Sequence, residues 1–158
     1  NLLAREKLHN ASCLAGIAFN AAGLGITHSL AHAIGGKLHI PHGRSNAIIL
    51  PHIIKFNANL NGGLYNKDYS LAAKKYQRLA KLLKLHAPNV HIGVNNLIRK
   101  IEELQKNLMI PTTLTKQGVD IGLLEESMEE ILKAALKDVF TEANPRAVTR
   151  EDLSNIIE

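Results

Sequence analysis

Aromatic residues are scarce in this sequence: they make up 4% of the 158 residues, and tryptophan is absent. A core must therefore be built from leucine, isoleucine, valine and alanine. With only five prolines, that composition favours packed helices over a sandwich or a barrel. Apolar residues still reach 46%, which is enough to bury the core of one ordinary domain and argues against disorder.

Cysteine and long apolar runs are missing as well. The single Cys13 excludes an internal disulfide, which fits a reducing cytoplasm. Charged residues or glycines interrupt every apolar run well short of a membrane span, and no signal segment opens the sequence. We therefore expect a soluble, cytoplasmic protein that does not enter the membrane.

The net charge is a mild +5, and the distribution of charge is more informative than its sign. Basic residues gather over 67–84 and glutamates over 125–130, each in a stretch with an apolar stripe at helical spacing. Such clusters are typical of solvated helix faces. Nucleic acid is not expected as a partner, because no aromatic stacking residues or known reader motif accompany the lysines.

The first part of the sequence predicts two helices. One, rich in small residues and above all in alanine, is expected from Leu2 to Ala22. Because small residues let neighbouring backbones approach closely, this helix is expected to be buried on several sides. The second is expected from Ile26 to Ile34, with Gly35-Gly36 as its stop and a loop over 37–43 after it.

The rest of the sequence is also helical in pattern, without a convincing strand. A helix is expected from Arg44 to Asn59, beginning near Ser45 or Asn46 and containing Pro51, and a turn follows at Asn61-Gly62-Gly63. Three apolar stripes then predict three more helices. They comprise Ala72, Tyr76, Leu79, Ala80 and Leu83; Val94, Leu97, Ile98, Ile101 and Leu104; and Leu124, Met128, Ile131, Leu132 and Ala135. A connection at Pro111-Thr112-Thr113 and a capping pair, Thr149 with Asp152, complete an all-α helical bundle.

Five of the eight histidines fall between residues 28 and 52. His28 and His32 are four residues apart on a predicted helix, so both imidazoles project from one face. His42 follows a helix end and a short loop, which can return it to the side of His28. Since neutral imidazole is the commonest metal-ligating side chain, this spacing indicates a metal site.

A second interpretation of the same histidines stays open. Two histidines at helical spacing are more often ordinary polar positions than ligands, and the HxxxH pattern here lacks the glutamate of a zinc protease motif. Two imidazoles alone do not hold a divalent ion tightly, and no acidic residue lies near the motif in the sequence. The residues by themselves therefore indicate an incomplete metal site.

A long ordered string surrounds these histidines. Residues 23–43, GLGITHSLAHAIGGKLHIPHG, resemble the signature of the iron-containing alcohol dehydrogenases, and the likeness continues through RSNAIILPHIIKFN at 44–57. The segments Ile110–Val119 and Asn144–Asp152 are similar to the family's later connection and its carboxyl-terminal ending. The resemblance covers essentially all of residues 1–158. It implies the C-terminal helical metal-binding domain of the dehydroquinate synthase-like fold.

The resemblance implies roles for four side chains. His28 and His42 match the two carboxyl-terminal ligands of the catalytic ferrous ion. His32 matches a histidine that lines the site without binding the metal, and to which proton relay and proximity to the nicotinamide are assigned. Phe19 matches an aromatic position near the nicotinamide and the substrate. The two other histidines of the group fall where no site role is usual, and we expect them to be structural or exposed: His39 and His52.

Other parts of the family pattern are missing from this sequence. Family members have an amino-terminal nucleotide-binding domain with a glycine-rich phosphate loop, and an Asp and a His that complete the coordination of the metal. We therefore expect a fragment, inactive alone, of an oligomeric enzyme. That enzyme would interconvert a small primary alcohol and its aldehyde, using Fe²⁺ and NAD(H) or NADP(H) bound mainly by the missing domain.

Two alternatives remain open at the level of sequence. The first is a glycerol- or diol-type dehydrogenase of the same superfamily that uses Zn²⁺ or another divalent metal. The second is a non-catalytic helical module whose basic helix binds an acidic partner.

Overall fold

The structure is a computed structural model that describes residues 1–60 and 68–157. Within these ranges it contains seven α-helices, one short 3₁₀ helix and no strand, which confirms the all-α prediction for this part of the chain. The predicted turn at Asn61-Gly62-Gly63 lies outside the described residues. The elements are α1 (Leu2–Ala22), α2 (Ile26–Leu38), α3 (His42–Ala58), α4 (Leu71–Leu82), α5 (Val90–Asn107), α6 (Ile121–Lys137), η2 (Thr141–Ala143) and α7 (Arg150–Ile157).

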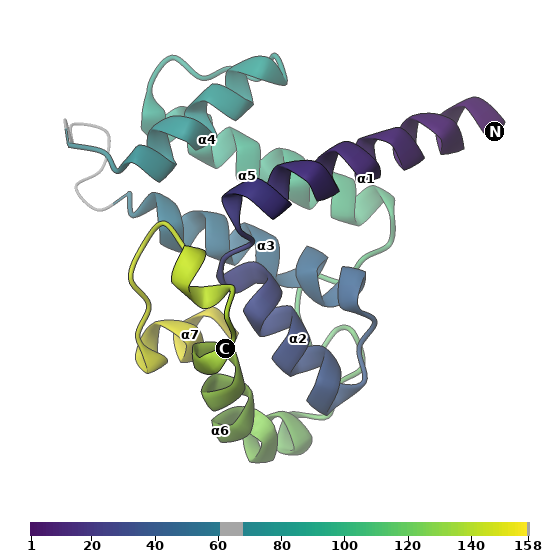
Figure 1. Cartoon of the computed structure of the whole chain (residues 1–158), viewed down its shortest axis with the longest axis vertical. Coiled ribbons are helices and arrows are strands. Elements are labelled where there is room, and N and C mark those ends of the chain that lie inside the picture. The colour runs from purple at the N-terminus through teal and green to yellow at the C-terminus, as the bar shows by residue number, and fades with distance from the viewer. Residues whose placement is uncertain (61–67, 158) are drawn as a thin grey trace.

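Helix α3 joins two groups of helices. On one side α4 and α5 pack against each other and against α3, and on the other side α2 and α7 pack against α3 and α6 (Figure 1). The main core lies in the second group, where Ile26, Leu30 and Ile34 form a fully buried stripe of α2. These residues are spaced by four, so one face of α2 is buried. The opposite face of α2 is not part of this core, so its side chains are available for a chemical role.

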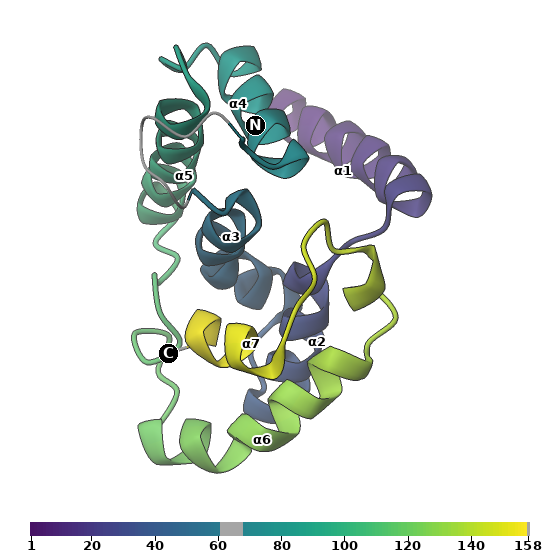
Figure 2. The ribbon, with the colours of Figure 1, turned by 90° about the vertical axis from the view of Figure 1, so that its left-hand side faces the viewer.

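Helix α1 forms where predicted, but the expectation that it is buried is wrong. None of its residues is buried, and Leu8, Leu14 and Ile17 are exposed. In Figure 1 it overlaps α5, whereas Figure 2 shows the two helices on opposite sides of the molecule. Small residues permit a neighbour to approach, but no described helix of this chain packs along α1. The composition therefore correctly predicted that α1 is helical, but it could not predict whether another helix packs against it.

The end of α2 also differs from the prediction. The helix continues through Gly35 and Gly36 to Leu38, and it ends at His39, which has a left-handed φ of 53°. An added Cβ on Gly35 would lie 3.1 Å from the carbonyl oxygen of Ile40. Glycine at this position thus serves the close approach of the returning chain rather than the helix stop.

Helix α3 begins at His42, two residues earlier than predicted, so the expected loop over 37–43 is shorter. Pro41 is its N-cap residue, and the Pro41 carbonyl accepts hydrogen bonds from the N–H groups of Arg44 and Ser45 at 2.9 and 3.0 Å. His42 is therefore fixed by the first turn of a helix, not by a loop.

The later helices agree with the sequence pattern, although Leu79, Leu83 and Leu104 of the predicted stripes are exposed. The predicted capping pair is present: the Thr149 N–H donates to the Asp152 carboxylate at 2.9 Å, and the Asp152 N–H donates to the Thr149 hydroxyl at 3.1 Å. The described basic residues of α4 and the glutamates of α6 are exposed, which confirms solvated faces.

Among the described residues, no single helix is both long and apolar enough to cross a membrane. Only taken together do α1 and α2, which are bent by 109° relative to each other, have that length and composition.

Candidate functional site

Three imidazoles gather where α2 and the first turn of α3 meet. His28 and His32 lie one turn apart on α2, with ring centroids 6.3 Å apart. His42 lies beside both, at 5.4 Å from His28 and 5.1 Å from His32. The structure thus brings together the three histidines that the sequence analysis singled out. The predicted convergence of His28 with His42 is observed.

Two glycines with left-handed φ values set the approach to α2. Gly23 has a φ of 78°, and a Cβ added there would lie 2.4 Å from the Ala143 Cβ. Gly25 has a φ of 70°, and a Cβ there would lie 3.0 Å from the Asn144 Oδ1. Only glycine accommodates both the conformation and the contact, so these residues let the segment around η2 pack against the start of α2.

The donor chemistry of His28 fits a metal ion. The Nδ1 of His28 is buried and has no hydrogen-bond partner. Burial lowers the pKa of His28, and the nearby His42 and His32 lower it further, while Asp138 opposes the shift. The neutral form, which is the form that binds metal, is thereby favoured. An unpartnered buried nitrogen is costly unless something occupies it, and a metal ion is one group that would.

The donor set of this chain is nevertheless partial. Among the described residues, no three His, Cys, Asp or Glu side chains are placed to hold one ion together. The Nε2 of His42 lies 2.9 Å from the side-chain amide of Asn46, which also donates to the His42 carbonyl at 3.1 Å. Within residues 1–60 and 68–157, His28 and His42 thus remain the two candidate ligands, and their role as ligands stays a prediction.

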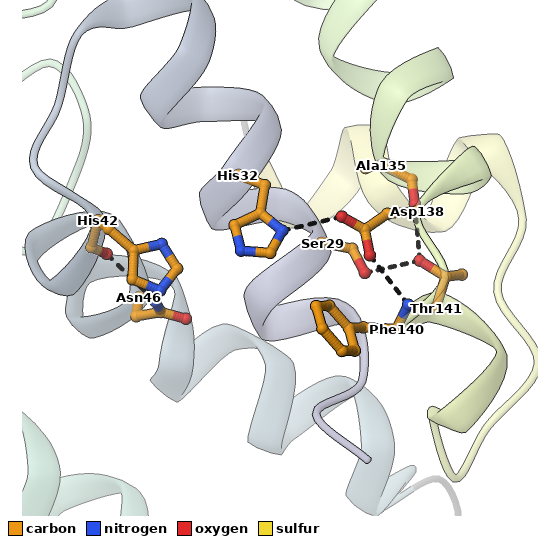
Figure 3. A network of polar contacts seen from close by, with 8 residues as sticks. All are labelled: Ser29, His32, His42, Asn46, Ala135, Asp138, Phe140 and Thr141. Carbon is orange, nitrogen blue, oxygen red and sulfur yellow. Dashed lines mark hydrogen bonds and ion pairs between the residues drawn. The ribbon is translucent and has the colours of Figure 1, made fainter. Parts of the chain in front are cut away.

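His32 has a different polar partner, and the sequence analysis missed it. Its Nδ1 lies 2.9 Å from Oδ2 of Asp138, the residue that ends α6, and Figure 3 shows the contact. Burial acts to raise the pKa of Asp138, but hydrogen bonds from His32 and from the Phe140 N–H outweigh it, and the pKa is lowered overall. The two residues are 106 positions apart, so no local pattern joins them.

Two phenylalanines flank the histidines. The Phe19 ring, 45% exposed at the end of α1, lies 6.4 Å from the His28 ring. The Phe140 ring lies 5.8 Å from the His32 ring, and sequence reasoning did not identify it. The remaining histidines of the group, His39 and His52, are exposed, in agreement with the prediction.

Comparison with known proteins supports one family. Residues 1–158 match the Fe-containing alcohol dehydrogenase family, C-terminal. An NADPH-dependent butanol dehydrogenase of Clostridium saccharobutylicum is 38% identical over 155 residues, covering 98% of this chain and 37% of that protein. A 1-propanol dehydrogenase of Citrobacter freundii is 39% identical over 159 residues, covering 99% and 40%. The crystal structure of a 1,3-propanediol oxidoreductase superposes with a TM-score of 0.84 and 32% identity, over 99% of this chain and 38% of that one.

The chain spans 37–40% of the length of these relatives. Its helical fold, its paired imidazoles and the match along its whole length agree with one another. The chain therefore belongs to the Fe-containing alcohol dehydrogenase family, whose C-terminal part it matches.

Proposed function

We propose that this chain is the metal-holding part of an iron-dependent enzyme that interconverts a small primary alcohol and its aldehyde with NAD(H) or NADP(H). The observation that carries the proposal is the cluster of three imidazoles within 6.3 Å of one another, with a buried and unpartnered nitrogen on His28. The names of the relatives, which refer to butanol and 1-propanol, support this class of substrate. A cytoplasmic location and an oligomeric full-length enzyme stay predictions.

His28 and His42 would hold Fe²⁺ through neutral imidazole nitrogens, and the remaining ligands would come from outside this chain. Bound there, the ion would supply Lewis-acid polarisation of the alcohol oxygen. Zn²⁺ has the same preference for imidazole, so the choice of iron rests on the family.

His32 would take the proton of the alcohol. Its ring lies beside that of His42, and its side chain is 42% exposed, so a proton accepted on the side of His42 has a route to solvent. An imidazole can accept a proton on one nitrogen and later release it, as a proton relay requires.

Phe19 and Phe140 would form apolar walls for the alkyl group and for the nicotinamide. Their rings lie next to His28 and His32 respectively. The nicotinamide would accept hydride from the carbinol carbon. Phe19 and His32 would be this chain's contribution to the cofactor site, and the part of the relatives that this chain does not cover would supply the rest.

The test is a substrate and metal panel on the full-length protein. With Fe²⁺ and each nicotinamide cofactor, oxidation of 1-propanol or 1-butanol should exceed oxidation of glycerol and 1,3-propanediol. Higher activity with the diols, or with Zn²⁺, would favour the diol-type alternative, which the likeness to a 1,3-propanediol oxidoreductase supports. Salt-sensitive binding to a polyanion without any metal-dependent oxidation would instead favour a basic binding module.

A further inference from the structure

A carboxylate reaches the histidine cluster from a helix other than those that carry the histidines. Asp138 follows α6, and its Oδ2 lies 2.9 Å from Nδ1 of His32 on α2. The side chain of Asp138 is 17% exposed, whereas that of His32 is 42% exposed. The acid is therefore the more shielded partner, and the imidazole is the one that faces outward.

Further contacts fix this carboxylate in place. Its Oδ1 accepts the N–H of Phe140 at 2.9 Å. Nearby, the Thr141 hydroxyl donates to the Ala135 carbonyl at 2.6 Å and lies 2.8 Å from the hydroxyl of the buried Ser29. Ser29 precedes His32 by one turn on α2, so the end of α6 is tied to the same face of α2 at two points (Figure 3). Asp138 thus has little freedom to rotate away.

The chemistry of the pair determines which nitrogen of His32 carries a proton. An ionised carboxylate can only accept a hydrogen bond, so Nδ1 must be the donor. In the neutral ring the lone pair then lies on Nε2. Figure 3 shows this second nitrogen on the side of the ring that faces His42. The carboxylate also stabilises the imidazolium that forms when Nε2 takes up a proton.

We propose that Asp138 is a positioning residue for His32, which it holds in the Nδ1–H tautomer with Nε2 free to accept the proton of the alcohol. The inference rests on the proposed function. In the step, the O–H bond of the alcohol breaks and an N–H bond forms at Nε2. The same proton later leaves Nε2 for water, so His32 returns to its starting state.

The first test measures the tautomer without any activity. Spectra of the ¹⁵N-histidine-labelled chain would be recorded as the pH is raised until the imidazole signals no longer change, so that the neutral tautomers are observed. His32 should be mainly Nδ1–H in the wild type. In Asp138→Asn it should be mainly Nε2–H, because an amide can donate to Nδ1. A wild-type His32 that is mainly Nε2–H overturns the inference, even if the variant fails to fold.

The second test is a double-mutant cycle in the full-length enzyme. Asp138→Asn should lower kcat for 1-propanol by roughly 10²–10⁴-fold while KM and iron content stay near the wild-type values. Added to His32→Ala, the same substitution should lower kcat no further, since it acts through that ring. The control is Asp152→Asn, which removes another hydrogen-bonded carboxylate, the one that caps α7, and should leave kcat unchanged.

The outcomes separate the inference from the proposed function. Additive losses in the double variant, or loss of iron from Asp138→Asn, would show a purely structural role and overturn the inference while leaving an alcohol dehydrogenase. If His32 shows the expected tautomers but the full-length protein oxidises no alcohol, the proposed function is refuted. In that case only the contact by which Asp138 positions His32 is supported.

Discussion

The imidazoles of His32 and His42 lie nearly parallel, with ring centroids 5.1 Å apart and planes inclined by 22°. Their polar partners differ in kind. A carboxylate holds Nδ1 of His32, whereas the Asn46 amide lies against Nε2 of His42. A carboxylate stabilises a protonated ring, and an amide N–H favours an unprotonated nitrogen. The two roles proposed above, proton transfer for His32 and metal binding for His42, therefore fall on rings with different partners, and the Asn46 amide would have to give up Nε2 of His42 for that nitrogen to bind a metal.

Alanine substitutions should separate these tasks in the full-length enzyme. His28→Ala and His42→Ala should each abolish iron binding and activity together, because each removes a proposed ligand. His32→Ala should retain iron and slow turnover by roughly 10²–10⁴-fold, as expected for loss of a proton relay. Iron content and steady-state rate, measured on the same preparations, check both statements.

The matched control is His52→Ala, because His52 lies on α3 with His42 but is exposed and outside the cluster. It should retain both iron and activity. Loss of iron from His32→Ala together with retention by His28→Ala would mean that the ligand and relay roles are reversed.

The chain alone should bind iron weakly and oxidise no alcohol. Two imidazoles leave several coordination positions to water, and among the described residues no third ligand joins them. Anaerobic loading with Fe²⁺ followed by dialysis should therefore leave well under one ion per chain, and 1-propanol with NAD or NADP should give no turnover. Stoichiometric iron that survives dialysis would contradict the two-ligand assignment.

Local patterns account for what could be predicted from the sequence. The stripe of α6 and the Thr149–Asp152 cap depend on residues within one helix, so spacing was sufficient to find them. The histidine cluster was found through a family motif rather than through spacing alone. Burial of α1 was predicted wrongly because it depends on a neighbour that composition does not reveal. The contact between His32 and Asp138 joins positions 106 residues apart and could not be inferred locally.

Substitution of Asn57 should destabilise the fold. Asn57 is 4% exposed and exchanges two amide hydrogen bonds with Asn144, at 3.1 and 2.8 Å. Asn57→Ala removes both, leaving polar atoms of Asn144 short of partners, at a cost of about 1–3 kcal/mol in the free energy of unfolding. Asn107→Ala, at the exposed end of α5, should change it by less than about 0.5 kcal/mol. Urea unfolding followed by circular dichroism measures the free energy of unfolding of both variants. Equal changes in Asn57→Ala and Asn107→Ala would contradict the prediction.

The cap of α7 should make part of the stability depend on pH. The Thr149 N–H and then the Thr149 hydroxyl hold the pKa of Asp152 below its ordinary value of 3.8. A carboxyl whose pKa is lowered by folding stabilises the protein above its unfolded pKa, and this contribution is lost as the pH falls through the folded pKa. Asp152→Ala should therefore cost about 1 kcal/mol at neutral pH, the usual effect of losing a helix cap, and less below pH 3.8.

Urea unfolding of the wild type and of Asp152→Ala at neutral pH and at about pH 3 measures this difference. The gap between the two proteins should narrow at the lower pH, because protonation removes from the wild type the interaction that the variant already lacks. Glu151→Ala is the control, since the neighbouring Glu151 is exposed and takes no part in the hydrogen bonds between Thr149 and Asp152. Glu151→Ala should change the free energy of unfolding only slightly at both pH values. A gap for Asp152→Ala that stays constant or widens on acidification would show that the ionised carboxylate is not what stabilises the start of α7.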